Sequence, residues 1–234
     1  MPADRFFIAA PLKNTLTLEG EEFHHLSNVM RIRLGETVEM INGQGELAEA
    51  ELTSLDKKIC QLKIISHHTS SKHQQSLILA PALTRPSILE WTLEKATELG
   101  ATEFWLFPGE RSEKKSLSET QLHRLETVVI NSLKQCGRLY LPKIILKPAL
   151  KEWQPPSGSL FFGDISPKAP LLKGPFDKTV VFFIGPEKGF SPAENQLLIE
   201  KFRAHPISLH ENILRAETAA IAALSQFYII KNKL

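Results

Sequence analysis

The stretch that decides the fold is TVVFFIGPEKGFSPAE, residues 179–194. Its first six residues are all β-branched or aromatic, as in strands buried on both faces of a parallel sheet. Ser191, Pro192 and Glu194 then provide an N-cap, a proline at the first helical position and a glutamate at the third, which predicts a helix start. Residues 185–190 are therefore predicted to be a loop that joins a central strand to a helix.

The same alternation of strands and helices extends from residue 77 to the C-terminus and predicts an α/β fold with a mostly parallel sheet. Capping boxes at Ser87-x-x-Glu90 and Ser118-x-x-Gln121 predict helix starts, and the helices end near Gly100 and Gly137. Further strands are predicted at 102–107, 159–163 and 206–209, and a closing helix from about Ala216 to Ile230.

The first 65 residues contain short apolar or alternating runs separated by turn signals, which predict a small β-barrel. One helix interrupts them at residues 23–30, where Phe23, Leu26 and Met30 share a face. The polar segment 66–76 is predicted to be a linker, so the domains are expected at 1–70 and 71–234. A metal-binding role for the histidines of this segment is the weaker alternative, because no cysteine or acidic ligand lies nearby.

Composition excludes several classes of protein. The longest apolar runs, FFIAA and TVVFFIGP, are far shorter than the roughly 20 residues that span a membrane, and the N-terminus lacks the pattern of a secretory signal. A cytoplasmic protein is expected. Its two cysteines exclude a disulfide framework. Residues 1–70 hold seven Lys and Arg against ten Asp and Glu, a net charge of −3; the remainder hold 21 against 16, or +5, so an RNA partner would need local basic groups.

Two loops are candidates for a ligand site, because ligands of open α/β sheets bind beyond the carboxyl ends of the strands. They are residues 185–190 and 210–215. The first matches neither the phosphate-binding loop nor the dinucleotide fingerprint. By itself it is equally well explained as an ordinary turn before a capped helix. Arg215 and Glu217, which bracket the start of the last helix, are equally well explained as a surface ion pair.

Taken together, GPEKGFSPAE and ILRAETA, residues 213–219, resemble the RsmE family of ribosomal RNA methyltransferases in the SPOUT superfamily. Further matches follow in the family's order: RFF at 5–7, HHLSNVMRIRLGE at 24–36, LEKATELGA at 93–101, ERS at 110–112 and QCGR at 135–138. The resemblance implies an N-terminal PUA-like β-barrel, a C-terminal parallel sheet with a trefoil knot, and a homodimer. It also implies methylation by S-adenosylmethionine of N3 of a uridine in small-subunit (16S) ribosomal RNA, with no metal and no membrane.

The resemblance also assigns roles to single residues. Arg215 is expected to supply a positive charge that makes uridine N3 lose its proton, and Glu217 to orient Arg215 or to accept that proton. The residues expected to bind the cofactor are Ile184, Gly185, Glu187, Gly189, Leu209, Ile213 and Leu214. Those expected to contact RNA are His24, His25, Arg31, Arg33, Arg85, Arg111 and Arg138.

The sequence departs from the family at two places. Lys188 stands where the family has glycine, so a positive φ there would cost roughly 1–2 kcal/mol and rearrange the loop. Arg85 and Pro86 stand where the family has lysine and glycine. Two alternative functions stay open: a SPOUT methyltransferase with another RNA target, and an RNA-binding assembly factor without catalysis.

Overall fold

The computed structural model describes residues 4–72, 74–166 and 168–232. The chain divides into two compact units. The smaller unit comprises the chain up to residue 72 together with residues 130–141, and the larger unit comprises the rest. The segment 130–141, which the sequence placed in the second predicted domain, thus belongs to the smaller unit in the structure.

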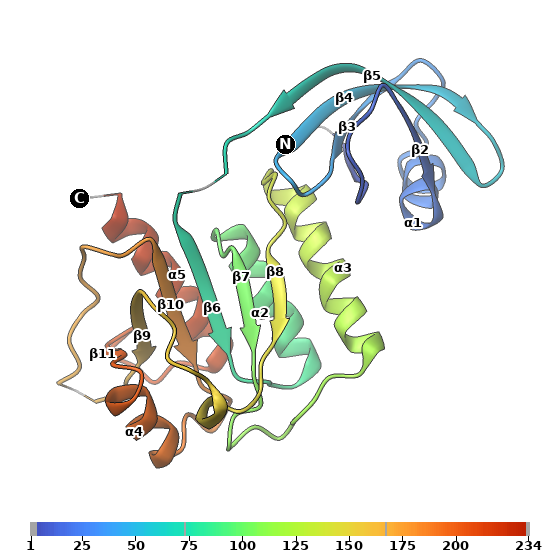
Figure 1. Ribbon diagram of the computed structural model, residues 1–234. Coiled ribbons are helices and arrows are strands. Elements are labelled where there is room, and N and C mark those ends of the chain that lie inside the picture. The colour runs from blue at the N-terminus through green and yellow to red at the C-terminus, as the bar shows by residue number, and fades with distance from the viewer. Residues whose placement is uncertain (1–3, 73, 167, 233–234) are drawn as a thin grey trace. The chain divides into compact units, whose positions relative to one another are not determined.

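The smaller unit is a curled five-stranded sheet with the strand order β1-β3-β4-β5-β2 (Figure 1). Its pairs are antiparallel except for the parallel pair of β1 with β3. The strands are β1 (Arg5–Phe7), β2 (Thr15–Glu19), β3 (Thr37–Ile41), β4 (Glu46–Leu55) and β5 (Ile59–Thr69). The predicted helix near residues 23–30 is confirmed, as α1 (Gly20–His24) followed by the π-helix η1 (His25–Met30).

The linker predicted at 66–76 is wrong at its start. Residues 66–69 form the end of β5, where Ser66 pairs with Glu49 and Thr69 pairs with Glu46 of β4. Backbone pairing with β4 satisfies the N–H and C=O groups of this segment whatever its side chains are, so its polar composition was misleading. The next strand, β6 (Ser76–Pro81), begins at the last residue of the predicted linker.

Residues 130–141 are held in the smaller unit by the turn between β3 and β4. The Leu141 amide donates to the Gly43 carbonyl (2.9 Å), and the Gly45 amide donates to the Leu139 carbonyl (2.9 Å). Gly45 has a φ of +96°, and a Cβ there would lie 2.4 Å from the Tyr140 ring. Only glycine fits at this position, because both the backbone conformation and the space exclude a side chain.

The larger unit is built on a six-stranded sheet with the order β11-β9-β10-β6-β7-β8, and every pair of strands is parallel. This confirms the predicted α/β fold class with a separate smaller β-domain; the trefoil knot stays a prediction. The strands after β6 are β7 (Glu103–Leu106), β8 (Lys143–Leu146), β9 (Ser159–Gly163), β10 (Thr179–Ile184) and β11 (His205–Ile207). The helical segments are α2 (Pro86–Glu98), α3 (Glu119–Cys136), η2 (Leu150–Glu152), α4 (Pro192–Glu200) and α5 (Ala216–Lys231). The sequence analysis had missed β8.

Two of the three predicted capping boxes are present. Ser191 caps α4 reciprocally with Glu194, and Ser118 exchanges hydrogen bonds with Gln121 before α3. The box at Ser87 is wrong. The N-cap of α2 is Arg85, because Pro86 has its φ fixed at a helical value and occupies the first helical position.

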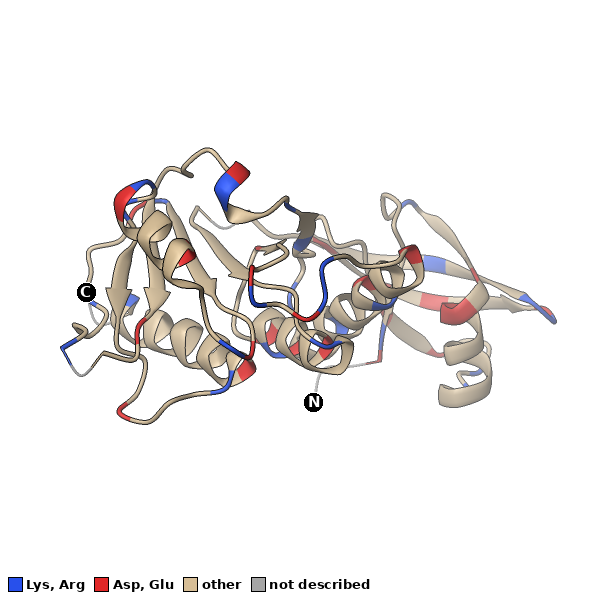
Figure 2. Ribbon diagram, turned by 90° about the horizontal axis from the view of Figure 1, so that it is seen from below, with Lys and Arg blue, Asp and Glu red and all other residues tan. Residues whose placement is uncertain are grey.

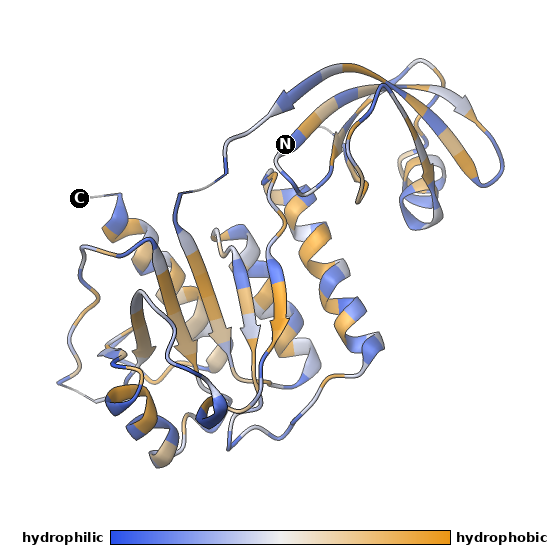
Figure 3. Ribbon diagram, viewed as in Figure 1, coloured by the Kyte–Doolittle hydropathy of each residue, from blue (hydrophilic) through white to orange (hydrophobic). Residues whose placement is uncertain are grey.

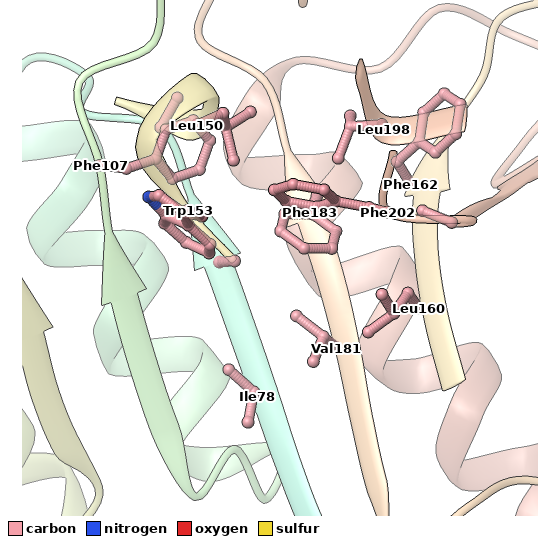
Figure 4. Packing of buried hydrophobic residues seen from close by; sticks show 13 residues of the cluster. Ile78, Phe107, Leu150, Trp153, Leu160, Phe162, Val181, Phe183, Leu198 and Phe202 are labelled. Atoms are coloured by element: carbon pink, nitrogen blue, oxygen red, sulfur yellow. The ribbon is translucent and has the colours of Figure 1, made fainter. Parts of the chain in front are cut away.

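The two faces of the parallel sheet are covered differently. Helices α2 and α5, which pack against each other, lie on one face, and α4 with η2 lies on the other (Figure 1). Figure 3 shows that the central strands β6 and β10 are strongly apolar, as burial on both faces requires. Trp153, which follows η2, packs against Phe107, Phe183 and Phe202 with ring centroids 5.6–6.3 Å apart (Figure 4). This aromatic cluster holds η2 and the end of α4 against the carboxyl half of β10.

Charged residues of both signs are scattered over the loops and helices (Figure 2). In the part of the chain that the structure describes, no helix combines the length and the apolar character needed to cross a membrane.

Candidate functional site

A cavity of about 540 Å³ lies at the carboxyl edge of the parallel sheet. Because β9, β10 and β11 run in the same direction, the loops that follow them meet at this edge. The two loops singled out in the sequence both line the cavity, and so do the starts of α4 and α5. All seven residues predicted for the cofactor lie around it: Ile184, Gly185, Glu187, Gly189, Leu209, Ile213 and Leu214.

The loop 185–190 folds back on itself. The Gly189 amide donates to the Pro186 carbonyl at 2.8 Å, and Gly189 has a φ of +67°. A Cβ on Gly185 would lie 2.9 Å from the Phe190 nitrogen and 3.1 Å from the Gly189 carbonyl carbon. Both glycines are therefore required by backbone geometry, and they bring the loop backbone to the wall of the cavity.

Lys188 does not strain this loop. Among the described residues, the non-glycine positions with positive φ are Arg31 and Arg203, and Lys188 is not one of them. The turn takes its left-handed residue at Gly189 instead. The rearrangement that the sequence analysis had linked to a left-handed Lys188 is therefore not needed. The lysine side chain extends toward solvent, with its Nζ 3.6 Å from Oε1 of Glu113.

A buried carboxylate ties the loop 185–190 and the start of α4 to the segment after β7. The side chain of Glu194, 4% exposed, accepts the Ser191 amide at Oε2 and the Glu110 amide at Oε1, both at 2.9 Å. The Ser191 hydroxyl donates in turn to the Glu110 carboxylate. The Arg111 guanidinium adds a hydrogen bond to the Lys188 carbonyl at 3.2 Å. The charge of Glu194 is stabilised by two backbone donors, which is what a buried carboxylate requires.

Arg85 contacts the cofactor loop from the start of α2. Its amide donates to Oε1 of Glu187 at 3.2 Å, and its Nε lies 3.7 Å from the same oxygen. Arg85 was predicted to contact RNA, and in the structure its guanidinium is next to a cavity-lining glutamate. The predicted RNA contact is not tested by this geometry.

The loop after β11 forms the other wall of the cavity. Gln226 of α5 donates to the Leu209 carbonyl at 2.8 Å, and a Cβ on Gly163 would lie 2.9 Å from the Leu209 side chain. Leu209 is thereby fixed between β9 and α5. Ile213, in contrast, is 79% exposed although it is apolar and lines the cavity. An exposed isoleucine in a concave site fits a surface that a ligand covers.

The two residues predicted to be catalytic lie at the rim. Arg215 is the N-cap of α5 and is exposed, and its neighbours Leu214 and Ala216 line the cavity. Glu217 is half-buried in the first turn of α5. Among the described residues, no salt bridge joins Arg215 to Glu217, so the simple surface ion pair is not formed.

A third loop of the site was missed in the sequence. Asp164 and Ile165, which follow β9, line the cavity beside the two predicted loops. The signal was available, because SLFFG had been identified as a buried parallel strand and the same edge rule applies to the loop after it. Lys188 and Arg111 also line the cavity, although the sequence had proposed neither for the cofactor.

Four of the residues predicted to contact RNA lie together in the sequence of the smaller unit, around η1. His24 is exposed, with its Nδ1 2.8 Å from the Asn28 side-chain nitrogen. Arg31 ends η1 in a left-handed conformation with a φ of 57°, and Arg33 is exposed two residues later. His25 was predicted on the solvent face, and this was wrong. Its ring packs 5.5 Å from that of Phe6 with Nδ1 buried, because η1 is π-helical and its faces do not follow the 3.6-residue period assumed.

The last of the predicted RNA contacts, Arg138, is half-buried in the smaller unit. Burial lowers the pKa of its guanidinium from the usual value. A guanidinium stays charged even so, and a partly desolvated cation binds an anion more strongly than an exposed one does.

No group of three or more His, Cys, Asp or Glu side chains is arranged to hold a metal ion within residues 4–72, 74–166 and 168–232. His73, one of the three histidines of the polar segment, lies outside the described residues.

The sequence matches two family descriptions. Residues 71–228 match the family described as the RNA methyltransferase domain. Residues 18–65 match the family described as the RNA methyltransferase PUA domain.

The chain is similar along most of its length to curated proteins and to a solved structure. It is 27% identical to the ribosomal RNA small subunit methyltransferase E of Buchnera aphidicola, covering 89% of this chain and 85% of the relative. It is 28% identical to the protein of the same name from Bacillus subtilis, covering 90% and 88%. A crystal structure of the Neisseria gonorrhoeae ribosomal RNA small subunit methyltransferase E, bound to S-adenosyl methionine, superposes with a TM-score of 0.87 at 25% identity and covers 97% of each chain.

The Glu194→Ala substitution is expected to destabilise the protein by about 1–3 kcal/mol, because it leaves the Ser191 and Glu110 amides without their buried acceptor. Urea unfolding measures the change. Glu200→Ala, which removes an exposed carboxylate from the same helix, should change stability by less than about 0.5 kcal/mol. Equal stabilities of the two variants would contradict the role given to Glu194.

Proposed function

Because the chain belongs to the RNA methyltransferase family, we propose that it transfers a methyl group from S-adenosylmethionine to N3 of a uridine in small-subunit ribosomal RNA. The observation that carries the proposal is the cavity between the loops 185–190 and 208–215, both of which lie inside the matched residues. The relatives named as small-subunit methyltransferases, and the related structure bound to the cofactor, support the substrate and the cofactor. A ribosomal substrate places the protein in the cytoplasm.

The residues around the cavity fit the cofactor. A volume of about 540 Å³ is within the range of small-molecule sites, which are about 300–1,000 Å³. Phe183, Ile184 and Leu209 give an apolar wall suited to an adenine ring. The bends at Gly185 and Gly189 bring backbone donors and acceptors to the same wall. When bound, S-adenosylmethionine supplies an electrophilic methyl group, and the task of the protein is to orient it and to exclude water.

The acceptor needs help from the protein. N3 of uridine carries a proton at neutral pH, and the ring becomes a nucleophile at N3 when that proton leaves. A fixed cation lowers the pKa of such a group and stabilises the negative charge that develops on the ring oxygens. Arg215 has the charge and the place for this role, at the rim between two lining residues. Glu217, one half-turn into α5, is placed to orient Arg215 or to accept the proton.

The proposal is tested by incubating the protein with labelled S-adenosylmethionine and unmethylated small subunits, then identifying the modified nucleoside. We expect N3-methyluridine from the wild-type protein. Arg215→Ala should still bind the cofactor by calorimetry but methylate at least about 100-fold more slowly, as when a charge-stabilising donor is lost. Arg124→Ala, which removes an exposed arginine that pairs with Glu90 away from the cavity, is the matched control and should be as active as wild type.

Three results would change the assignment. A different methylated nucleoside would indicate another RNA target. Ribosomal RNA binding without any binding of S-adenosylmethionine would favour the alternative of an assembly factor that does not catalyse. Wild-type methylation by Arg215→Ala would remove Arg215 from the reaction.

Binding of RNA is proposed for the smaller unit, which contains the match to the RNA methyltransferase PUA domain. Arg31 and Arg33 are exposed beside η1, where they are available to phosphates. Arg31→Ala with Arg33→Ala should weaken RNA binding and reduce the slope of log K against log salt by up to about two, because two phosphate contacts release fewer counterions. Lys57→Ala with Lys58→Ala, in the exposed turn between β4 and β5, is the control of equal charge. A slope unchanged by the first pair would exclude Arg31 and Arg33 from the RNA surface.

A homodimer is proposed through α2 and α5, which pack side by side in the larger unit. Three large apolar side chains on these helices are exposed: Trp91 (43%), Tyr228 (64%) and Ile229 (50%). Apolar groups gathered on adjacent helices are the usual core of a subunit interface.

Sedimentation velocity should therefore find a dimer for the wild-type protein and a monomer for Trp91→Glu with Tyr228→Glu, because two buried charges oppose association. Ile199→Glu changes a comparably exposed residue on α4 and should leave the dimer intact. A wild-type monomer at micromolar concentration would refute the interface.

A further inference from the structure

The ionisable side chains around the cavity are not evenly distributed. Two basic side chains, Arg111 and Lys188, come from segments that contact each other, because the Arg111 guanidinium donates to the Lys188 carbonyl at 3.2 Å. The acidic side chains come from three separate places: Asp164, Glu187 and Glu211. The rim near Lys188 thus has a paired positive charge.

Two of the acidic groups already have nearby donors. Glu187 accepts the Arg85 amide at 3.2 Å and has the Arg85 guanidinium nitrogen Nε 3.7 Å away. Asp164 accepts the Ser166 amide at 3.0 Å. These contacts offset part of the negative charge around the cavity, so the two cations are not cancelled by them.

The partner of Lys188 is weak. Its Nζ lies 3.6 Å from Oε1 of Glu113, and the two side chains are 67% and 66% exposed. An ion pair this exposed contributes at most about 1 kcal/mol, because water screens both charges. Lys188 is therefore able to exchange Glu113 for a better-placed anion without a large cost.

The backbone at Lys188 is fixed even though its side chain is exposed. The Pro186 carbonyl accepts from Gly189 on one side of it, and Arg111 binds the carbonyl of Lys188 itself. The ammonium group is thus carried by an ordered loop at the cavity rim, and only the side chain has to move to reach a ligand.

From this arrangement we infer that Lys188, together with Arg111, binds the carboxylate of the methionine part of S-adenosylmethionine. The inference rests on the proposed function and concerns the same cavity. The carboxylate is the one anionic group of that cofactor, and charge-assisted hydrogen bonds from an ammonium and a guanidinium are the strongest that such a group forms in proteins. The family's glycine at this position has no side chain to offer, so Lys188 gives this chain a contact of its own with the cofactor.

The test compares two ligands and a set of variants by isothermal titration calorimetry. The ligands are S-adenosylmethionine and its decarboxylated form, S-adenosyl 3-methylthiopropylamine, which lacks the carboxylate and keeps the amine. We expect the wild-type protein to prefer S-adenosylmethionine by about tenfold or more. Lys188→Met should lose about five- to tenfold in affinity for S-adenosylmethionine, the range of one charge-assisted contact, and nothing for the decarboxylated ligand.

Two further variants complete the set. Lys188→Arg keeps the charge and should keep most of the preference for the carboxylate. Lys151→Met removes an exposed lysine that does not line this cavity and should bind both ligands as the wild type does.

The outcomes separate this inference from the function it rests on. Equal losses for both ligands in Lys188→Met would mean that Lys188 shapes the loop and does not contact the carboxylate, which overturns the inference. Unchanged affinities in that variant would overturn it as well, while leaving the proposed function intact. A wild-type protein that binds neither ligand would overturn both.

Discussion

The parallel pairing of the central strands is the constraint on which the rest of the structure depends. β9, β10 and β11 are joined by hydrogen bonds in a register that sets Phe183 opposite Phe162, and Ile207 opposite Gly163. Because the strands run the same way, their carboxyl ends lie at one edge, and loops far apart in sequence become neighbours there. The cavity is a consequence of that arrangement, since each of its three loops would be an ordinary connection in isolation.

The site is held in place from both sides of the sheet edge. The aromatic cluster around Trp153 fixes the carboxyl half of β10, and the buried carboxylate of Glu194 fixes the loop that follows it. Both are tertiary contacts between segments distant in sequence. They keep the cofactor loop ordered before any ligand binds, so less binding energy has to be used for ordering it.

An exposed position in an otherwise constrained loop can change without disturbing the fold. The turn at 185–190 requires glycine at 185, for space, and at 189, for conformation. Lys188 lies between these two requirements and is subject to neither of them. A substitution at such a position adds a charged group to the rim of the cavity while the loop keeps its shape. This explains why a departure from the family's sequence is compatible with the family's fold.

The sequence by itself determined the fold class, the helix starts at Ser118 and Ser191, and the two principal loops of the site, because periodicity and capping are local properties. It misplaced the start of α2 and the end of β5, where proline geometry and strand pairing outweigh local composition. Only the tertiary structure decided that residues 130–141 belong with the smaller unit, that the loop after β9 completes the cavity, and that Lys188 and Arg111 share its rim. Those facts depend on which distant segments meet, and no single segment encodes its partner.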